Sequence, residues 1–315
     1  MKTLMILVVC CMAAVGNFAC DACGGNIGGD GWGLVPNNNR HFIGLRFQYR
    51  QYHNQHPTDD HNSPTGFENA TDNFFRTDLI GRYSITRRLQ LQGTLPYRYN
   101  MRIETDTKLL ESGIGDASLA VNFFPVIPGM NDWKHALQVN GGVEAPTGKF
   151  NFSHDVPSNM QTGSGSWDYF AGISYVIRYR SFGIGLDATQ RFNGHTNAGY
   201  DWGNSTSYSG KILLNIMSDS VTSWMPWTGV GGEYFESNIE NMKYQIRAAY
   251  SGGNALSWNT GIDFYNPNIG FGIEIGLPLV NQLAEGYTSM KISAGARLMI
   301  FIQNKSGRQQ AAFNK

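Results

Sequence analysis

The chain has 315 residues, of which 38 are glycine and 13% are aromatic, but only 15% are charged, and its formal net charge is +0. Soluble proteins usually carry about 25% charged residues. A mean hydropathy of -0.30, with no long apolar run after the N-terminus, excludes a bundle of transmembrane helices. A transmembrane β-barrel fits both facts, because apolar and polar residues alternate along its strands and cancel in an average. The neutral net charge offers no argument for nucleic acid as a partner.

The N-terminus has the features of a signal peptide over residues 1–19. Lys2 supplies the positive charge, and residues 4–15 form an apolar stretch that is too short to span a bilayer. Cleavage near Ala19 predicts an exported chain.

Two cysteines, Cys20 and Cys23, remain in the exported chain as Cys-Asp-Ala-Cys-Gly-Gly. Three interpretations stay open: a disulfide in the oxidising periplasm, lipidation of Cys20, and metal capture with further ligands from elsewhere. Haem attachment is disfavoured, because Gly24 stands where Cys-x-x-Cys-His needs histidine. Residues 20–39 as a whole predict a flexible, Gly-rich periplasmic segment.

From Ile43 onward, apolar and polar residues alternate in segments that are separated by polar, Gly-rich or Pro-rich breaks, which is the pattern of β-strands. In the first segment, Leu45 and Phe47 share one face while Arg46 and Gln48 take the other. The pattern predicts an all-β fold, a transmembrane antiparallel up-and-down β-barrel with about twelve strands, over residues 40–303, followed by a periplasmic tail over residues 304–315. The expected strands cover residues 43–50, 75–83, 89–98, 117–123, 137–144, 168–178, 182–191, 211–216, 230–234, 258–264, 269–275 and 290–300.

The connections between these segments alternate in length, as in bacterial barrels that have short periplasmic turns and long outer loops. This alternation places both termini on the periplasmic side. Residues 239–249 leave two interpretations open, a loop or an additional strand. The short connections cover residues 84–88, 179–181 and 266–268, and the long ones cover residues 52–72, 146–166, 194–207 and 236–255.

A soluble β-sandwich would also alternate, but here one face of nearly every segment carries charge and the opposite face is almost free of it. This contrast predicts a lumen face and a lipid face instead of a core face and a solvent face. Aromatic residues at the segment ends fit the girdles of a membrane interface. They are Tyr49, Tyr83, Tyr97, Trp133, Trp167, Tyr179, Trp227, Tyr234 and Trp258.

The charged face predicts the lining of the barrel lumen. Such charges either form an ion-pair network that stiffens the wall or line a path for a polar solute, and a basic excess on the first three segments favours anionic or polar solutes. A barrel of about twelve strands is narrow, so the lumen is either a slender pore or is closed by an inward loop or by the N-terminal segment. The predicted lumen residues are Arg46, Arg50, Arg76, Asp78, Arg82, Arg98, Arg102, Glu144, Asp168, Asp187, Arg191, Lys211, Glu233, Asp263, Glu274, Lys291 and Arg297.

The first long connection offers a candidate metal site. His53, His56 and His61, near Asp59 and Asp60, have side chains suited to zinc or copper, although a solvated polar loop is the favoured interpretation. A barrel enzyme acting on lipid would need a paired serine and histidine, and no such spacing is visible. The sequence therefore predicts no catalytic residue and no cofactor.

Six short motifs follow one another between residues 83 and 168: Tyr83-Ser84-Ile85-Thr86, Leu89-Gln90-Leu91, Leu95-Pro96-Tyr97, Gly113-Ile114-Gly115-Asp116, Glu144-Ala145-Pro146-Thr147-Gly148 and Gly163-Ser164-Gly165-Ser166-Trp167-Asp168. In this order they resemble a family of outer-membrane channels named for the meta-cleavage pathway of phenol degradation. The resemblance implies a barrel channel for hydrophobic or aromatic solutes. The Cys-Asp-Ala-Cys-Gly-Gly start departs from the family pattern, which puts the phenol-type substrate in doubt and leaves room for a metal-related role.

Together these patterns predict an outer-membrane channel or transporter that passes a small aromatic, hydrophobic or anionic solute through a charge-lined lumen. The expected partners are outer-membrane lipid and that solute. The alternative is a closed barrel that acts as a binding or metal-handling module through its outer loops and the N-terminal Cys-x-x-Cys.

Overall fold

The computed structural model of the chain describes residues 40–57, 67–127, 132–151, 156–196, 200–217, 222–240, 246–247 and 250–302. The predicted signal peptide, Cys20, Cys23 and the predicted C-terminal tail lie outside the described residues.

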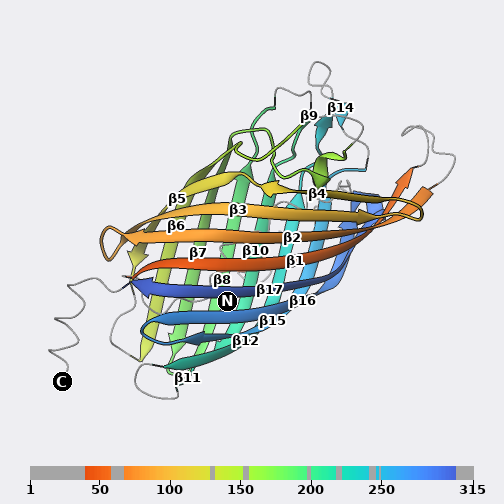
Figure 1. Ribbon diagram of the computed structural model, residues 1–315. Helices are drawn as coiled ribbons and strands as arrows, with labels where there is room; N and C mark the ends of the chain where they lie inside the picture. The colour runs from red at the N-terminus through yellow and green to blue at the C-terminus, as the bar shows by residue number, and fades with distance from the viewer. Residues whose placement is uncertain are drawn as a thin grey trace, which may run out of the picture.

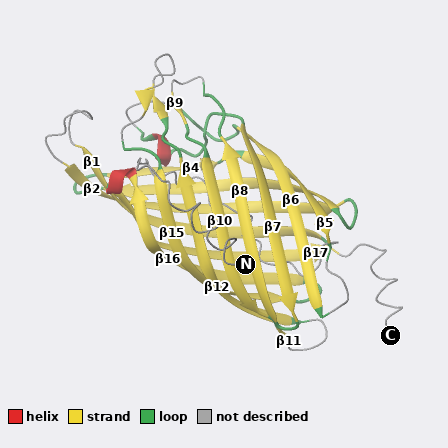
Figure 2. Ribbon diagram, turned by 180° about the vertical axis from the view of Figure 1, so that it is seen from behind, coloured by secondary structure: helices red, strands yellow, loops and turns green. Residues whose placement is uncertain are grey.

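Within these ranges, twelve antiparallel strands form a closed barrel (Figures 1 and 2), which confirms the predicted fold. Two of the twelve are each built from two segments, because β4 and β5 pair with successive parts of β3, and β10 and β11 both pair with β12. The wall consists of β1 (His41–Pro57), β2 (Phe67–Ser84), β3 (Leu89–Ile103), β4 (Lys108–Ile114) with β5 (Ala117–Val126), β6 (Trp133–Ala145), β7 (Asp168–Tyr179), β8 (Phe182–Phe192), β10 (Ser205–Leu214) with β11 (Ile216–Met217), β12 (Ser223–Phe235), β15 (Gly253–Tyr265), β16 (Ile269–Leu283) and β17 (Thr288–Ile302).

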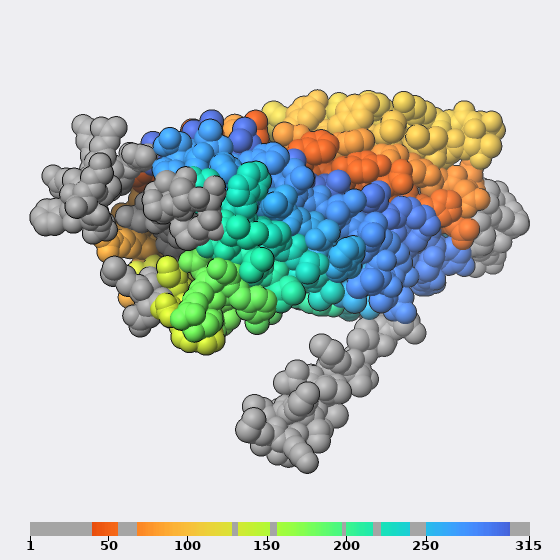
Figure 3. Space-filling view, turned by 90° about the horizontal axis from the view of Figure 1, so that it is seen from below, coloured from red at the N-terminus to blue at the C-terminus, as the bar shows by residue number. Residues whose placement is uncertain are grey.

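The barrel closes where the first strand meets the last. β1 pairs with β17 from His41, opposite Ile302, to Asn54, opposite Thr288. Figure 3 shows the first strands, in red and orange, lying against the last strand, in blue. Closure lets the backbone of each barrel strand bond to two neighbours, as a sheet in hydrocarbon requires.

The two ends of the barrel differ in the length of their connections. The turn end holds the short connections, such as those from β2 to β3 and from β7 to β8, and the loop end holds the long ones, such as that from β6 to β7. The loop end lies at the top of Figure 1. It also holds η1 (Ser158–Met160), η2 (Ala284–Gly286) and a small sheet of β9 (Tyr200–Asp201), β13 (Ile239–Glu240) and β14 (Ile246–Arg247).

The described parts of the segment 239–249, residues 239–240 and 246–247, thus belong to this small sheet and not to the barrel wall. The predicted loop over residues 52–72 is wrong at both ends, because β1 continues to Pro57 and β2 begins at Phe67. Polar residues occupy both faces of β1 and β2 in these extensions, so the sequence shows no alternation of apolar and polar residues there. None of the helices in the described ranges is long and apolar enough to cross a membrane.

Alternation along the strands decides which side chains face outward. On β1, Leu45 and Phe47 are 50% and 42% exposed, whereas Arg46 and Gln48 are 7% and 4% exposed. Such an apolar band around the outside of a barrel is suited to hydrocarbon and not to water. The other strands extend the band with exposed Leu79, Leu95, Leu119, Ile173, Leu186, Ile212, Val230, Ile273 and Leu298.

Aromatic side chains gather at both rims of this apolar band. At the turn end, the rings of Trp133 and Tyr179 lie 4.7 Å apart, and towards the loop end the rings of Tyr49 and Phe75 lie 4.8 Å apart. Amphipathic rings at these depths match the interface between hydrocarbon and lipid headgroups.

Two predicted orientations are wrong. Trp227 faces the interior, and Trp224, three residues earlier on β12, takes the outward place against Phe264. Lys291 is exposed, because the register between β1 and β17 shifts at this point. Tyr52 pairs with Met290 after Gln51 has paired with Ile292, so Met290 and not Lys291 faces the interior. A one-residue shift exchanges the two faces of a strand, and the sequence pattern does not reveal where such a shift occurs.

The barrel interior has two apolar clusters with a polar layer between them. Along β1, Phe42 belongs to the cluster near the turn end, Arg46 and Arg50 to the polar layer, and Tyr52 to the cluster near the loop end. The turn-end cluster consists of Phe42, Ile80, Met225, Tyr265, Met299 and Phe301, and the loop-end cluster consists of Tyr52, Phe74, Met160, Phe235, Ala255, Leu283 and Met290.

Candidate functional site

The polar layer contains ion pairs between neighbouring strands. Arg46 on β1 lies opposite Asp78 on β2, and a guanidinium nitrogen of Arg46 is 2.7 Å from the buried carboxylate. Arg76 donates from its Nε to the other oxygen of Asp78 at 2.6 Å. One buried carboxylate therefore holds two guanidinium groups, which is how charges inside a protein are usually stabilised.

A second group of charges joins β15, β16 and β17. The guanidinium of Arg297 donates to Glu274 at 2.9 Å and also to Asp263. Gly272 on the middle strand permits this, because a Cβ there would lie 2.2 Å from an oxygen of Asp263. Glycine at this position leaves room for an ion pair that passes over the strand.

A third ion pair links strands that are not neighbours. Arg50 on β1 donates two hydrogen bonds to Glu233 on β12, at 2.8 and 2.9 Å. Since β15, β16 and β17 separate these strands in the wall, the pair crosses the lumen.

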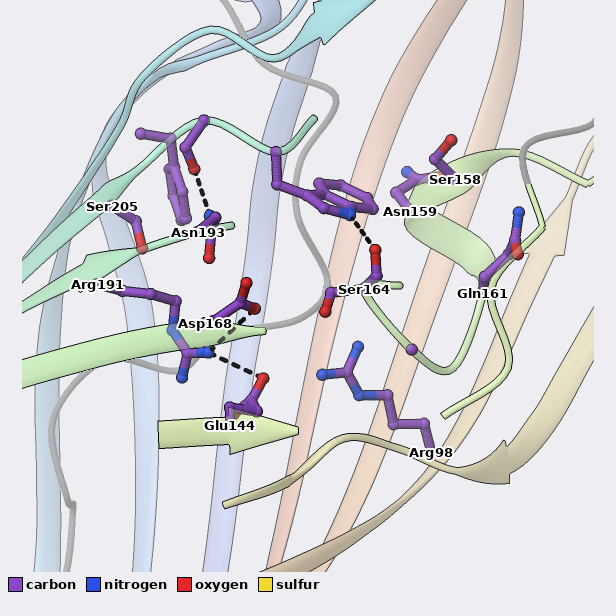
Figure 4. Close-up of a pocket in the computed structure, with 14 residues that line it drawn as sticks. Arg98, Glu144, Ser158, Asn159, Gln161, Ser164, Asp168, Arg191, Asn193 and Ser205 are labelled. Atoms are coloured by element: carbon purple, nitrogen blue, oxygen red, sulfur yellow. Dashed lines mark hydrogen bonds and ion pairs between the residues drawn. The ribbon is translucent and has the colours of Figure 1, made fainter. Parts of the chain in front are cut away.

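The loop end contains a charged pocket of about 60 Å³ (Figure 4). Arg191 on β8 lies 2.8 Å from Glu144 and 3.8 Å from Asp168. Arg98 enters the pocket from β3, on the far side of Glu144 from Arg191. The pocket therefore presents both signs of charge to a solute.

The connection from β6 to β7 folds into the barrel beside this pocket. Met160, in η1, is fully buried and packs in the loop-end cluster among side chains from β1, β2, β12, β15, β16 and β17. Asn100 on β3 donates a hydrogen bond from Nδ2 to the carbonyl of Met160 at 2.9 Å. The predicted inward loop is thus present, and it narrows the lumen.

Asp116 fastens both stems of this inward loop. Its buried carboxylate accepts hydrogen bonds from the backbone N–H of Gly148 at 2.8 Å and of Ser164 at 2.5 Å. The two stems approach closely, because a Cβ on Gly163 would lie 2.5 Å from the backbone carbon of Gly148. The motifs that carry the family resemblance therefore meet in space, where they hold the loop.

Three cavities follow one side of the barrel interior, and each of them is lined in part by β10 and β12. The loop-end pocket and a narrow cavity of about 10 Å³ share Arg191 and Phe235 as lining residues. The narrow cavity and a mid-lumen cavity of about 150 Å³ share Ser207 and Glu233. Together they form an interrupted polar route that passes the inward loop.

Apart from Lys291, the predicted lumen residues face the barrel interior. Two of them make further contacts: a guanidinium nitrogen of Arg82 donates to Gln92 at 2.6 Å, and the ammonium of Lys211 lies 3.8 Å from Asp187.

The sequence interpretation missed three buried carboxylates, which are Asp72, Asp116 and, in the small loop-end sheet, Asp201. Asp72 binds Arg102 through two contacts of 2.7 Å, and it was placed in a loop. Asp72 is separated from Arg76 and Asp78 by even numbers of residues on β2, so the three side chains lie on the same face of the strand. This spacing could have identified Asp72 as a lumen residue. Asp116 stands in one of the resemblance motifs, but nothing in its spacing indicates a role in holding a loop.

The candidate metal site lies only partly within the described residues. His53 is on the outward face of β1, the side chain of His56 is not described, and His61 lies outside the described residues. In the ranges that the structure covers, no group of three or more His, Cys, Asp or Glu side chains is arranged to hold a metal ion.

Comparison with solved structures finds outer-membrane barrels. The crystal structure of an outer-membrane channel from Pseudomonas putida F1 matches with a TM-score of 0.61 at 13% identity, over 88% of this chain and 100% of that chain. The transport unit of the autotransporter AIDA-I from Escherichia coli gives 0.47 at 11% identity, over 83% of this chain and 90% of that chain. LpxR from Salmonella typhimurium gives 0.41 at 7% identity, over 83% of this chain and 100% of that chain.

No protein-family model matches the chain, and a search of curated proteins finds no match. The resemblance to the phenol-pathway channels therefore stays a prediction. What the structural likeness shows is the fold, the closed twelve-stranded antiparallel barrel of bacterial outer-membrane proteins.

Proposed function

We propose that the protein is an outer-membrane channel that conducts a small polar solute along the β8, β10 and β12 side of the barrel. The observation that carries this proposal is the run of three cavities, which pass the inward loop and share lining residues from one to the next. A barrel interior packed only for stability would be close-packed and would leave few cavities that share lining residues. The proposal assigns no catalytic residue.

The outer surface supports a location in the outer membrane. The apolar band and its aromatic rims fit a bilayer, and the fold is that of outer-membrane barrels. Conduction also requires the turn-end cluster to open, and this is feasible because Met225 and Met299 are flexible, unbranched side chains.

Charge is distributed unevenly around the interior, which favours polar solutes. The inward faces of β1 to β3 are rich in arginine, whereas Glu144, Asp168, Asp187 and Glu233 lie on the wall from β6 to β12. Positive charge on one wall of the lumen and negative charge on the facing wall orient a dipolar solute and exclude apolar solutes.

Single-channel recording in planar bilayers tests the proposal. We expect discrete current steps whose ion selectivity changes in Arg191→Gln and Glu233→Gln, because both side chains line the cavities. Lys291→Gln is the matched control, since Lys291 is exposed on the outside. Arg46 and Arg76 lie outside the cavity linings, so their neutralisation is expected to have a smaller effect than that of Arg98.

A silent bilayer with correctly folded protein would favour the second candidate function, a closed barrel that acts as a binding module. The two apolar clusters and the pair between Arg50 and Glu233 are the observations on its side.

A further inference from the structure

Among the residues that line the mid-lumen cavity, neutral hydrogen-bonding side chains outnumber charged ones. The cavity lies between β1, β10, β12, β15, β16 and β17, within the polar layer. Hydroxyl groups of Ser207, Ser209, Ser257 and Ser293 and the amide of Asn259 line it. This lining offers many weak donors and acceptors to a ligand.

The charged side chains that border the cavity already have partners of opposite charge. Arg50 binds Glu233, and Arg297 binds Glu274 and Asp263. Lys211 lies 3.8 Å from Asp187, and its ammonium is 5.6 Å from the centre of the Trp227 ring. An ionic ligand would have to break one of these pairs, whereas an uncharged ligand leaves them intact.

Three buried polar atoms on side chains that line the cavity lack a hydrogen-bond partner among the described residues. One is the Nε of Arg297, whose guanidinium is already paired with Glu274 and Asp263. The other two belong to neutral groups with opposite requirements: the Oε1 of Gln48, which is almost fully buried, is an acceptor, and the indole Nε1 of Trp227 is a donor. Buried polar atoms are rarely left in this state, so a water molecule or a ligand is expected at both neutral groups.

The chemistry that satisfies both neutral groups is narrow. An anion without a hydroxyl group cannot donate to Gln48, and an ammonium without one cannot accept from Trp227, while ions that do carry hydroxyl groups are disfavoured by the ion pairs they would have to break. A hydroxyl group does both. The cavity volume of about 150 Å³ equals that of a protein cavity known to hold benzene, which has as many non-hydrogen atoms as glycerol.

We infer that the mid-lumen cavity is a binding site for a small uncharged polyol, which bonds to Gln48 and Trp227 as it passes through the barrel. The inference rests on the proposed channel function and names its solute class. Binding at such a site is weak enough for the solute to leave again, as transport requires.

The test compares three solutes of similar size with the full-length protein in liposomes. Erythritol is uncharged, threonate is an anion and choline is a cation. We expect swelling driven by erythritol to saturate with concentration and to exceed that driven by either ion, after subtraction of the rates in protein-free liposomes. Titration of the protein in detergent with erythritol, followed by tryptophan fluorescence, measures binding without transport.

Gln48→Leu removes one hydrogen-bonding group at nearly constant side-chain size, and Trp227→Phe removes the indole N–H together with one ring. Each is expected to weaken erythritol binding about three- to tenfold, the usual effect of one lost hydrogen bond. Gln51→Leu and Trp224→Phe are the matched controls on the outward faces of the same two strands, and they should bind erythritol as the parent does. Heat-modifiable migration in gels confirms that each variant is folded.

The outcomes separate the inference from the proposed function. One outcome is that ion currents are recorded, that erythritol flux rises linearly with concentration, and that neither Gln48→Leu nor Trp227→Phe changes this flux. This outcome would overturn the polyol site and leave the channel function intact. Erythritol binding that depends on Gln48 and Trp227, without any current or flux, would keep the site and reject the channel. The absence of both binding and flux would reject both.

Discussion

Arg50 on β1 and Glu233 on β12 are joined across the barrel interior by two parallel hydrogen bonds of 2.8 and 2.9 Å. Three strands separate β1 from β12 in the wall, so this pair is a brace across the lumen and not a contact within the sheet. It lies beside the mid-lumen cavity, where Glu233 also lines the narrow passage towards the loop end. The pair therefore both stiffens the barrel and limits its width.

Breaking this brace should widen the lumen and lower stability. Arg50→Gln and Glu233→Gln are each expected to lower the free energy of unfolding by about 2 kcal/mol, less than for a fully buried pair, because 13% and 16% of the two side chains are exposed. The double variant should lower the free energy of unfolding by less than the sum of the two single effects. Both single variants and the double variant should show a larger single-channel conductance. Urea titrations of folding in detergent measure the coupling, with the exposed pair of Arg180 and Asp132 as a control of nearly zero coupling. Strictly additive effects at Arg50 and Glu233 would contradict the brace.

Asp116 should control the inward loop. Asp116→Asn replaces a carboxylate oxygen by a donor that faces the N–H of Gly148 or Ser164, which is expected to cost about 1 to 3 kcal/mol. Trypsin should then cleave after Lys149, in the loop, about tenfold faster than in the parent protein. Asp106→Asn, in an exposed turn at the same end, should leave the cleavage rate unchanged. Equal cleavage rates in both variants would mean that the loop is held by other contacts.

Met160 should anchor the same loop through apolar packing. Because its side chain is fully buried in the loop-end cluster, Met160→Ala is expected to lower the free energy of unfolding by about 2 to 4 kcal/mol. Met101→Ala, on the outward face of β3, removes the same atoms from a partly exposed site and should cost less than about 1 kcal/mol. Thermal unfolding followed by gel mobility compares the two. A similar shift in both variants would show that Met160 contributes no more than a surface methionine.

The free-energy cost of an arginine on the outer apolar band should depend on how deep the position lies in the membrane. Leu45 lies in mid-band, opposite Leu79 and Leu298, so Leu45→Arg is expected to cost about 2 to 4 kcal/mol in a lipid bilayer. Tyr83, near the turn end, lies at the expected interface, and Tyr83→Arg should cost about 0 to 1 kcal/mol. Folding titrations in lipid vesicles measure both changes. Equal costs would place the membrane boundary elsewhere on the barrel.

Local alternation made the wall predictable from sequence. Leu45 and Arg46 fall on opposite faces of a strand whatever surrounds them, because successive side chains in a strand point to opposite sides. The same rule placed Asp78, Arg191 and Arg297 inside the barrel. It failed at Lys291, where the register shift against β1 reverses the two faces.

Only the tertiary structure decided what fills the lumen. The sequence left a slender pore and an inward loop as alternatives. Glu233, the partner of Arg50, lies 183 residues away in the chain, and the two backbone N–H groups that bind Asp116 lie 32 and 48 residues away. Alternation fixes the side of the wall on which a side chain lies, but closure of the barrel determines which distant side chains meet across it. The charged lining could therefore be predicted from the sequence, whereas the brace, the fastening of the loop and the mid-lumen cavity depend on the curvature and register of the closed sheet.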